Sequence, residues 1–176
     1  MKKREIIIKK YAQGKNVLDI GSVGQSEQKY KLWDFLEKYT STLVGIDMLP
    51  SSKQNIIQGN METYNFNKKF DVIVAGDIIE HVDNQGLLLN NIKRHLKNNG
   101  KFILSTQNAK WFLYPFVKHN PTHTLVHDPD TLTNILERFG FEIEIFEYYD
   151  GNKYHNIIEK ILCQKKSMVV VCRKKR

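Results

Sequence analysis

A short apolar segment that ends in an acid and two glycines is the sharpest chemical signal in the sequence. It spans residues 17–25, VLDIGSVGQ, and runs into a helical pattern. Glycine permits positive φ and close approach of a ligand to the backbone, while a carboxylate at a strand end can fix loop amides or accept from a ligand's amino group. The segment predicts a cofactor loop, although a tight strand-to-helix turn also needs glycine for structural reasons alone.

Two further segments place polar side chains where a nucleoside could bind. Asp47 ends an apolar run 26 residues beyond Gly21, and a carboxylate there can accept from both hydroxyls of a ribose. Asn60 and Met61 follow the next apolar run, where an amide could bond an adenine edge and a thioether could pack on its face. Taken singly, each segment is better explained as a plain turn. Together with the glycine loop, Asp47 favours a nucleotide-like cofactor.

An acid and a histidine, Glu80 and His81, follow the buried run at residues 70–75. The ordinary histidine pKa of about 6.5 suits a general base. The alternative is a structural histidine that caps the next helix together with Glu80.

Three histidines recur every four residues later in the chain, at His119, His123 and His127. On a helix this spacing would align three imidazoles on one face, as in a metal site. Pro121 interrupts the helical register, and no cysteine or carboxylate cluster completes a ligand set. We therefore expect no metal from this trio.

An α/β framework would bring these residues together. Five β-branched runs predict buried parallel strands at residues 16–20, 43–47, 55–57, 70–75 and 101–105. Helical spacing of apolar residues predicts helices over 26–39 and 83–97, the second with Gly100 as its C-cap. Alternation of strand and helix predicts a three-layer sandwich with right-handed crossovers, whose ligands bind outside the carboxyl ends of the strands.

The last third departs from this alternation. Asp128 and Pro129 open a predicted helix over 130–139, and strands are predicted at 141–146 and 168–172. Residues 155–163 could supply a short crossover helix, but an antiparallel hairpin at the sheet edge is the simpler interpretation. With no internal repeat or linker, we expect a single domain over residues 1–176.

Composition and charge limit the class of protein. The 176 residues are 41% hydrophobic and 26% charged, as in a globular domain. The net charge of +8 lies at the two ends, because residues 1–15 carry +5 and 165–176 carry +6, whereas 16–164 carry −3. We interpret these ends as basic tails, which are more often solubilising than RNA-binding. Without a membrane span, a signal peptide or a metal-spaced cysteine pair, the expected location is cytoplasmic.

Together the motifs resemble those of the class I S-adenosylmethionine-dependent methyltransferases, in particular the small-molecule group that includes the ubiquinone-biosynthesis O-methyltransferases. The segments that carry the resemblance are residues 17–25, 45–47, 59–62, 80–82, 96–101, 120–123 and 132–141. The resemblance implies an α/β fold, a Rossmann-like three-layer sandwich with a seven-stranded, mostly parallel sheet and an antiparallel last strand. It also implies S-adenosyl-L-methionine as the methyl donor.

The resemblance further assigns roles to single residues. The loop would hold the methionine part of the cofactor, and the acid at position 47 would hold its ribose. Residues 48, 60 and 61 would contact its adenine, and residues 77 and 78 would lie beneath the cofactor. The cofactor-binding residues so implied are Asp19, Gly21, Ser22, Gly24, Asp47, Met48, Asn60, Met61, Asp77 and Ile78. The catalytic residues so implied are Glu80, His81 and His123. The usual family loop is DxGxGxG; Val23 and Gln25 depart from it, and Asn60 replaces an aspartate.

The expected function is methyl transfer to a small-molecule, lipid-like or sugar acceptor by a monomer or weak homodimer. Two alternatives stay open. A nucleic-acid methyltransferase would use the basic ends, but residues 77–80 read DIIE where the Asn/Asp-Pro-Pro-Tyr/Trp motif would stand. A binding module that kept the fold and lost the chemistry would be explained by Val23 and Gln25.

Overall fold

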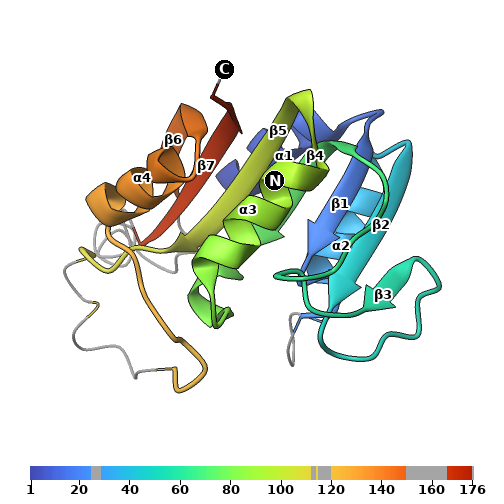
Figure 1. The fold of residues 1–176 in the computed structure, drawn as a ribbon, viewed down its shortest axis with the longest axis horizontal. Helices are drawn as coiled ribbons and strands as arrows, with labels where there is room; N and C mark the ends of the chain where they lie inside the picture. Colours follow the sequence, from blue (N-terminus) through green and yellow to red (C-terminus); the bar gives the residue numbers. More distant parts are fainter. Residues whose placement is uncertain (25–28, 112–113, 115–119, 150–165, 176) are drawn as a thin grey trace.

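The computed structural model describes residues 1–24, 29–111, 114, 120–149 and 166–175, whose strands form one seven-stranded sheet (Figure 1). The strands are β1 (Asn16–Ile20), β2 (Thr42–Asp47), β3 (Ile56–Gln58), β4 (Phe70–Gly76), β5 (Leu96–Gln107), β6 (Phe141–Tyr149) and β7 (Ser167–Lys174). Their spatial order is β3-β2-β1-β4-β5-β7-β6. Strands β1 to β5 pair in parallel, whereas β7 is antiparallel to both β5 and β6. The predicted antiparallel last strand is confirmed.

Helices cover both faces of this sheet. Figure 1 shows α3 (Gln85–His95) and α4 (Pro129–Arg138) in front of the sheet, with α1 (Lys3–Ala12) and α2 (Lys31–Glu37) behind it. A single 3₁₀ turn, η2 (Ile79–His81), follows β4. The three-layer sandwich is therefore as expected. No helix of the described residues is long and apolar enough to cross a membrane.

Side chains of the central strands alternate between two apolar layers. In β4, Ile73 and Ala75 join the layer beneath α3 and α4, whereas Val72 and Val74 join the layer beneath α1 and α2. Because the central strands are buried on both faces, their sequences read as continuous apolar runs rather than as alternating patterns. This continuity explains why the sequence located these strands.

Two helix boundaries differ from the expectations. Helix α2 begins only at Lys31, after Tyr30 in the left-handed region with φ 55°. Helix α3 ends at His95, and β5 begins at the next residue, so Gly100 lies inside a strand and does not cap a helix. The pairing of β4 with β5 is irregular there, and a Cβ at residue 100 would meet both Leu96 and a main-chain carbonyl. The suggested helix over 155–163 lies outside the described residues.

The basic segment at the amino end forms α1 instead of a tail. Ile8 and Ala12 lie four residues apart and bury one helix face in the layer that also holds Trp33. The Glu5 carboxylate accepts from the main-chain amide of Lys2 at 2.9 Å and so caps the first turn. At the other basic end, residues 167–174 form β7. Lys3, Lys9 and Lys10 thus lie on α1, and Lys174 lies on β7.

The N-cap of α4 yields a test of local stability. The Asp128 carboxylate accepts from the amides of Asp130 and Thr131, each at 2.9 Å. We expect Asp128→Ala to lower the free energy of unfolding by about 1 kcal/mol, because two amides lose their acceptor. Urea denaturation measures this change. Asp128→Asn keeps an acceptor oxygen and should retain most of the stability; equal losses in both variants would contradict the capping role.

Candidate active site

Parallel pairing brings the carboxyl ends of β1, β2 and β4 to one edge of the sheet. Asp19 is in register with Gly45 of β2 and Val74 of β4. Asp47 ends β2, and Asp77 follows β4 directly. Three acids that lie far apart in the sequence therefore meet at the edge where parallel α/β sheets bind ligands.

The glycine loop follows β1 at this edge. Gly21 and Gly24 adopt φ of 78° and 66°, values that favour glycine. A Cβ at residue 21 would collide with the side chain of Ile78, so the close packing of loop against β4 also requires glycine there. The main-chain amide of Val23 donates to the Asp47 carboxylate at 2.8 Å and ties the loop to β2.

Val23, which departs from the glycine pattern, has a side chain that is only 2% exposed. It packs into the apolar layer beneath α1 and α2 and is not displayed on the outer side of the loop. The hydroxyl of Ser22 donates to the main-chain carbonyl of Asp19 at 2.7 Å and is likewise buried. The loop therefore keeps a compact backbone despite Val23. Gln25 lies outside the described residues.

The Asp19 side chain is fully buried beneath this loop. Neither carboxylate oxygen has a hydrogen-bond partner among the described residues. Burial raises the pKa of Asp19 to about 8, and the charge of Asp47 adds to the rise, while the Ser22 hydroxyl and Arg4 act against it. Such an unpartnered buried acid fits a site whose cationic partner arrives from outside the protein.

The two segments expected to face a nucleoside differ in exposure. Asp47 is half-buried and its two oxygens accept from the amides of Val23 and Leu49, at 2.8 and 2.9 Å. Met48, next to it, is 69% exposed. Asn60 uses its side-chain oxygen to accept from the Glu62 amide at 2.8 Å, which closes the turn after β3.

Met61 is only 5% exposed and packs in the layer beneath α3 and α4. The structure therefore gives Met61 a packing role, whereas Met48 offers the exposed thioether at this edge.

Asp77 adopts a strained backbone and carries an ion pair. Its φ of 54° lies in the left-handed region, unusual for a residue other than glycine. Its carboxylate accepts from the Arg4 guanidinium at 2.7 Å and from the hydroxyls of Ser105 and Tyr149, both at 3.3 Å. Burial raises the pKa of Tyr149 to about 12, so this phenol remains a proton donor. Arg4 thus holds the end of β4 in place from helix α1.

Sequence reasoning missed Arg4, because it was counted with the basic tail. The signal that could have found it is the four-residue spacing of Ile8 and Ala12, which places both on one face when residues 3–12 are helical. A helix in that place projects a first-turn arginine toward the strand ends.

Glu80, His81 and His123 come together next to this acidic edge. One potential ligand atom from each lies within 4.8 Å of the others, and the two imidazole rings meet edge to face with centroids 4.7 Å apart. Glu80 is fully buried and the histidines are half-buried. Burial raises the pKa of Glu80 to about 7, helped by the charge of Asp77, while the nearby Thr106 hydroxyl and Gln107 main chain lower it. All three expected catalytic residues lie in one cluster.

His127, another member of the four-residue series, lies outside this cluster. His127 is buried, and its Nε2 contacts the Gln85 side-chain oxygen at 3.0 Å. Burial lowers the pKa of His127, so it remains a neutral structural residue. His119 lies outside the described residues.

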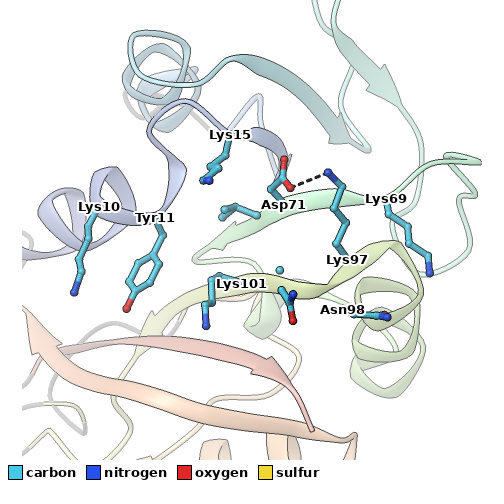
Figure 2. A pocket seen from close by; sticks show the side chains of 11 residues that line it. Lys10, Tyr11, Lys15, Lys69, Asp71, Lys97, Asn98 and Lys101 are labelled. Atoms are coloured by element: carbon cyan, nitrogen blue, oxygen red, sulfur yellow. Dashed lines mark hydrogen bonds and ion pairs between the residues drawn. The ribbon is translucent and has the colours of Figure 1, made fainter. Parts of the chain in front are cut away.

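A separate cavity of about 650 Å³ lies at the opposite edge of the sheet, where β1 and β4 begin (Figure 2). Five lysines surround it: Lys10, Lys15, Lys69, Lys97 and Lys101. Asp71 pairs with Lys97 at 2.8 Å, and Glu144 pairs with Lys101 at 2.6 Å. This basic cavity is remote from the acids at the carboxyl ends.

Comparison with known proteins identifies related chains. A family model described as "Methyltransferase domain" matches residues 3–144. A ubiquinone biosynthesis O-methyltransferase of Rickettsia canadensis is 39% identical over 104 residues, which cover 52% of this chain and 44% of that protein. The chain therefore spans less than half the length of that curated relative.

Solved structures share the fold. An S-adenosylmethionine-dependent methyltransferase from Mesorhizobium loti aligns with a TM-score of 0.71 and 14% identity, covering 97% of this chain and 98% of that one. The glycopeptide N-methyltransferase MtfA complexed with sinefungin aligns with a TM-score of 0.70 and 15% identity, covering 98% and 93%. At these identities the likeness establishes the fold.

The buried acid beneath the loop generates a pH-dependent prediction. The folded protein holds a proton on Asp19 up to a pKa of about 8, whereas the unfolded chain releases it above about pH 4. Its contribution to stability is complete below about pH 4 and is lost as the pH rises toward 8. Asp19→Asn cannot ionise, so we expect its free energy of unfolding to exceed that of the wild type increasingly over this interval.

Urea denaturation of the ligand-free protein across the interval measures this difference, with Asp83→Asn as the exposed control. Parallel stability curves for Asp19→Asn and the wild type would show that Asp19 does not titrate on folding.

Proposed function

The chain belongs to the class I S-adenosylmethionine-dependent methyltransferases, and from this premise we propose that its methyl acceptor is a small molecule. The observation that carries the proposal is the separation of charge between the two edges of the sheet. The candidate acceptor residues lie beside the acids at the carboxyl edge, whereas five lysines that could bind a nucleic-acid backbone surround the opposite cavity. The small-molecule chemistry of the curated relatives supports the same choice.

We propose that the residues at the carboxyl edge hold the cofactor as the family resemblance implies. When bound, S-adenosylmethionine supplies an activated methyl group on a sulfonium centre. The unpartnered Asp19 carboxylate would compensate the positive charge of an amino group, and burial would strengthen that attraction. Asp47 would accept from the ribose hydroxyls with the lone pairs that its two amide contacts leave free. The exposed Met48 would pack on the adenine.

We assign the acceptor side to Glu80, His81 and His123. Ile78, which packs on Gly21, links the loop to this cluster, so the cofactor and acceptor sites would adjoin. Methyl transfer is an in-line displacement, and it needs an acceptor atom held close and on axis. The buried Glu80 and the half-buried histidines would provide the side chains that hold this atom.

The cofactor proposal predicts a large effect at Asp47. Asp47→Ala removes the ribose acceptor and the tether of the Val23 amide, so we expect S-adenosylhomocysteine to bind at least about tenfold more weakly, since charge-assisted hydrogen bonds contribute roughly 1.5–3 kcal/mol. Calorimetric titration measures the affinity. Glu37→Ala, an exposed acid on α2, is the control and should bind as the wild type does. Unchanged affinity in Asp47→Ala would remove this residue from the site.

The acceptor class is tested by methyl transfer itself. The protein is incubated with methyl-labelled S-adenosylmethionine and separate pools of hydroxylated aromatic compounds, sugars and RNA. We expect label in a small-molecule product and none in RNA, because the lysines lie at the wrong edge to guide a polynucleotide to the acceptor side.

Label in RNA alone would favour the nucleic-acid alternative. Binding of S-adenosylhomocysteine without transfer to any pool would instead favour a binding module.

A further inference from the structure

We propose that Glu80, His81 and His123 bind one divalent transition-metal cation of the zinc type. The three side chains offer one carboxylate oxygen and two imidazole nitrogens within 4.8 Å of one another. The expectation of no metal rested on the series His119, His123 and His127. The proposed set retains His123 alone from that series and takes its other two ligands from η2, 42 residues earlier in the sequence.

The Glu80 carboxylate is the first observation that points to a cation. The residue is 0% exposed, and neither oxygen has a hydrogen-bond partner among the described residues. Buried carboxylates are normally paired, hydrogen-bonded or metal-bound, because removal from water is costly. A cation between Glu80 and the two imidazoles would satisfy this carboxylate.

The hydrogen bonds of His81 fix which of its nitrogens is available. Its Nδ1 lies 3.2 Å from the Thr122 carbonyl and 3.0 Å from the Thr122 hydroxyl. That hydroxyl donates its own proton to Asn120 Oδ1 at 2.8 Å, so both groups act as acceptors toward His81. Nδ1 therefore carries the proton and Nε2 keeps a lone pair. A ligating histidine whose other nitrogen donates to a carbonyl is the usual arrangement in metal sites.

Asn120 contacts His123 through its side-chain amide, in the opposite sense to the contact at His81. The Asn120 side-chain oxygen accepts from the amide and hydroxyl of Thr122, which leaves its NH₂ group as the donor toward His123 Nε2 at 3.2 Å. This nitrogen therefore accepts a hydrogen bond through its lone pair, and a cation bound there would take the place of the Asn120 NH₂ group. Because residues 120–123 form one turn, the same short segment positions both imidazoles.

The donor set selects the kind of cation. Two imidazoles and one carboxylate suit Zn²⁺, Co²⁺, Ni²⁺ or Fe²⁺, whereas Mg²⁺ and Ca²⁺ prefer oxygen ligands. Three protein ligands leave a coordination position for an oxygen or nitrogen of another molecule. If the proposed function holds, that molecule is the acceptor, and its class narrows to compounds with a metal-binding hydroxyl or amine.

Cobalt provides a direct test, because Co²⁺ reports its coordination by visible absorption. The full chain is treated with a chelator, dialysed and titrated with Co²⁺, followed by displacement with Zn²⁺. We expect one equivalent to bind with the intense spectrum of four- or five-coordinate cobalt. Loss of a residue that only supports a metal ligand weakens binding roughly 10–100-fold. Loss of a direct ligand should cost more, so Glu80→Gln, His81→Ala and His123→Ala should each weaken cobalt binding by at least about 100-fold.

Asp83→Asn is the matched control, because this exposed acid lies three residues beyond Glu80 and outside the cluster. It should bind cobalt as the wild type does. Circular dichroism checks the fold of each variant, and the half-buried His81 and His123 positions keep the test decisive if Glu80→Gln does not fold.

Binding of S-adenosylhomocysteine, measured separately, distinguishes this proposal from the proposed function. Normal S-adenosylhomocysteine binding with no stoichiometric cobalt, or with cobalt bound equally by all variants, would overturn the metal site and leave the proposed function standing. Stoichiometric cobalt that depends on the three ligands, without S-adenosylhomocysteine binding, would support the metal site and overturn the proposed function.

Discussion

The gathering of four carboxyl groups, two of them buried, is the constraint around which one edge of the sheet is built. Parallel pairing leads Asp19, Asp47 and Asp77 to this edge, and η2 adds Glu80. The structure treats them in two ways. Asp47 accepts from main-chain amides and Asp77 pairs with Arg4, whereas Asp19 and Glu80 are withdrawn from water and have raised pKa values. The edge is therefore predisposed toward positively charged ligands.

The net charge of +8 conceals this arrangement. Lysines gather at the amino ends of the strands, around the cavity of Figure 2, and acids gather at the carboxyl ends. A sum over the chain reports neither group. The location of the basic residues along the sequence was also a poor guide to their function. Residues 1–15 include Arg4, which pairs with Asp77 at the carboxyl end of β4.

The sequence predicted the strands well because β1, β4, β5 and β7 are buried on both faces and read as continuous β-branched runs. It predicted poorly what depends on contacts between distant residues. Arg4 meets Asp77 across 73 positions, and the outward or inward direction of Val23 is decided by packing against another helix. The prediction that Gly100 caps a helix was wrong, because α3 passes directly into β5 without the loop that a glycine cap requires.

The position of β7 has a consequence for how the chain reaches its native state. This strand follows the other six in sequence and yet lies between β5 and β6. During synthesis, the apolar edge of β5 therefore stays without its neighbour until residues 167–174 have left the ribosome. An unprotected central strand invites pairing with other chains, so the growing polypeptide is most prone to aggregation immediately before its sheet is completed.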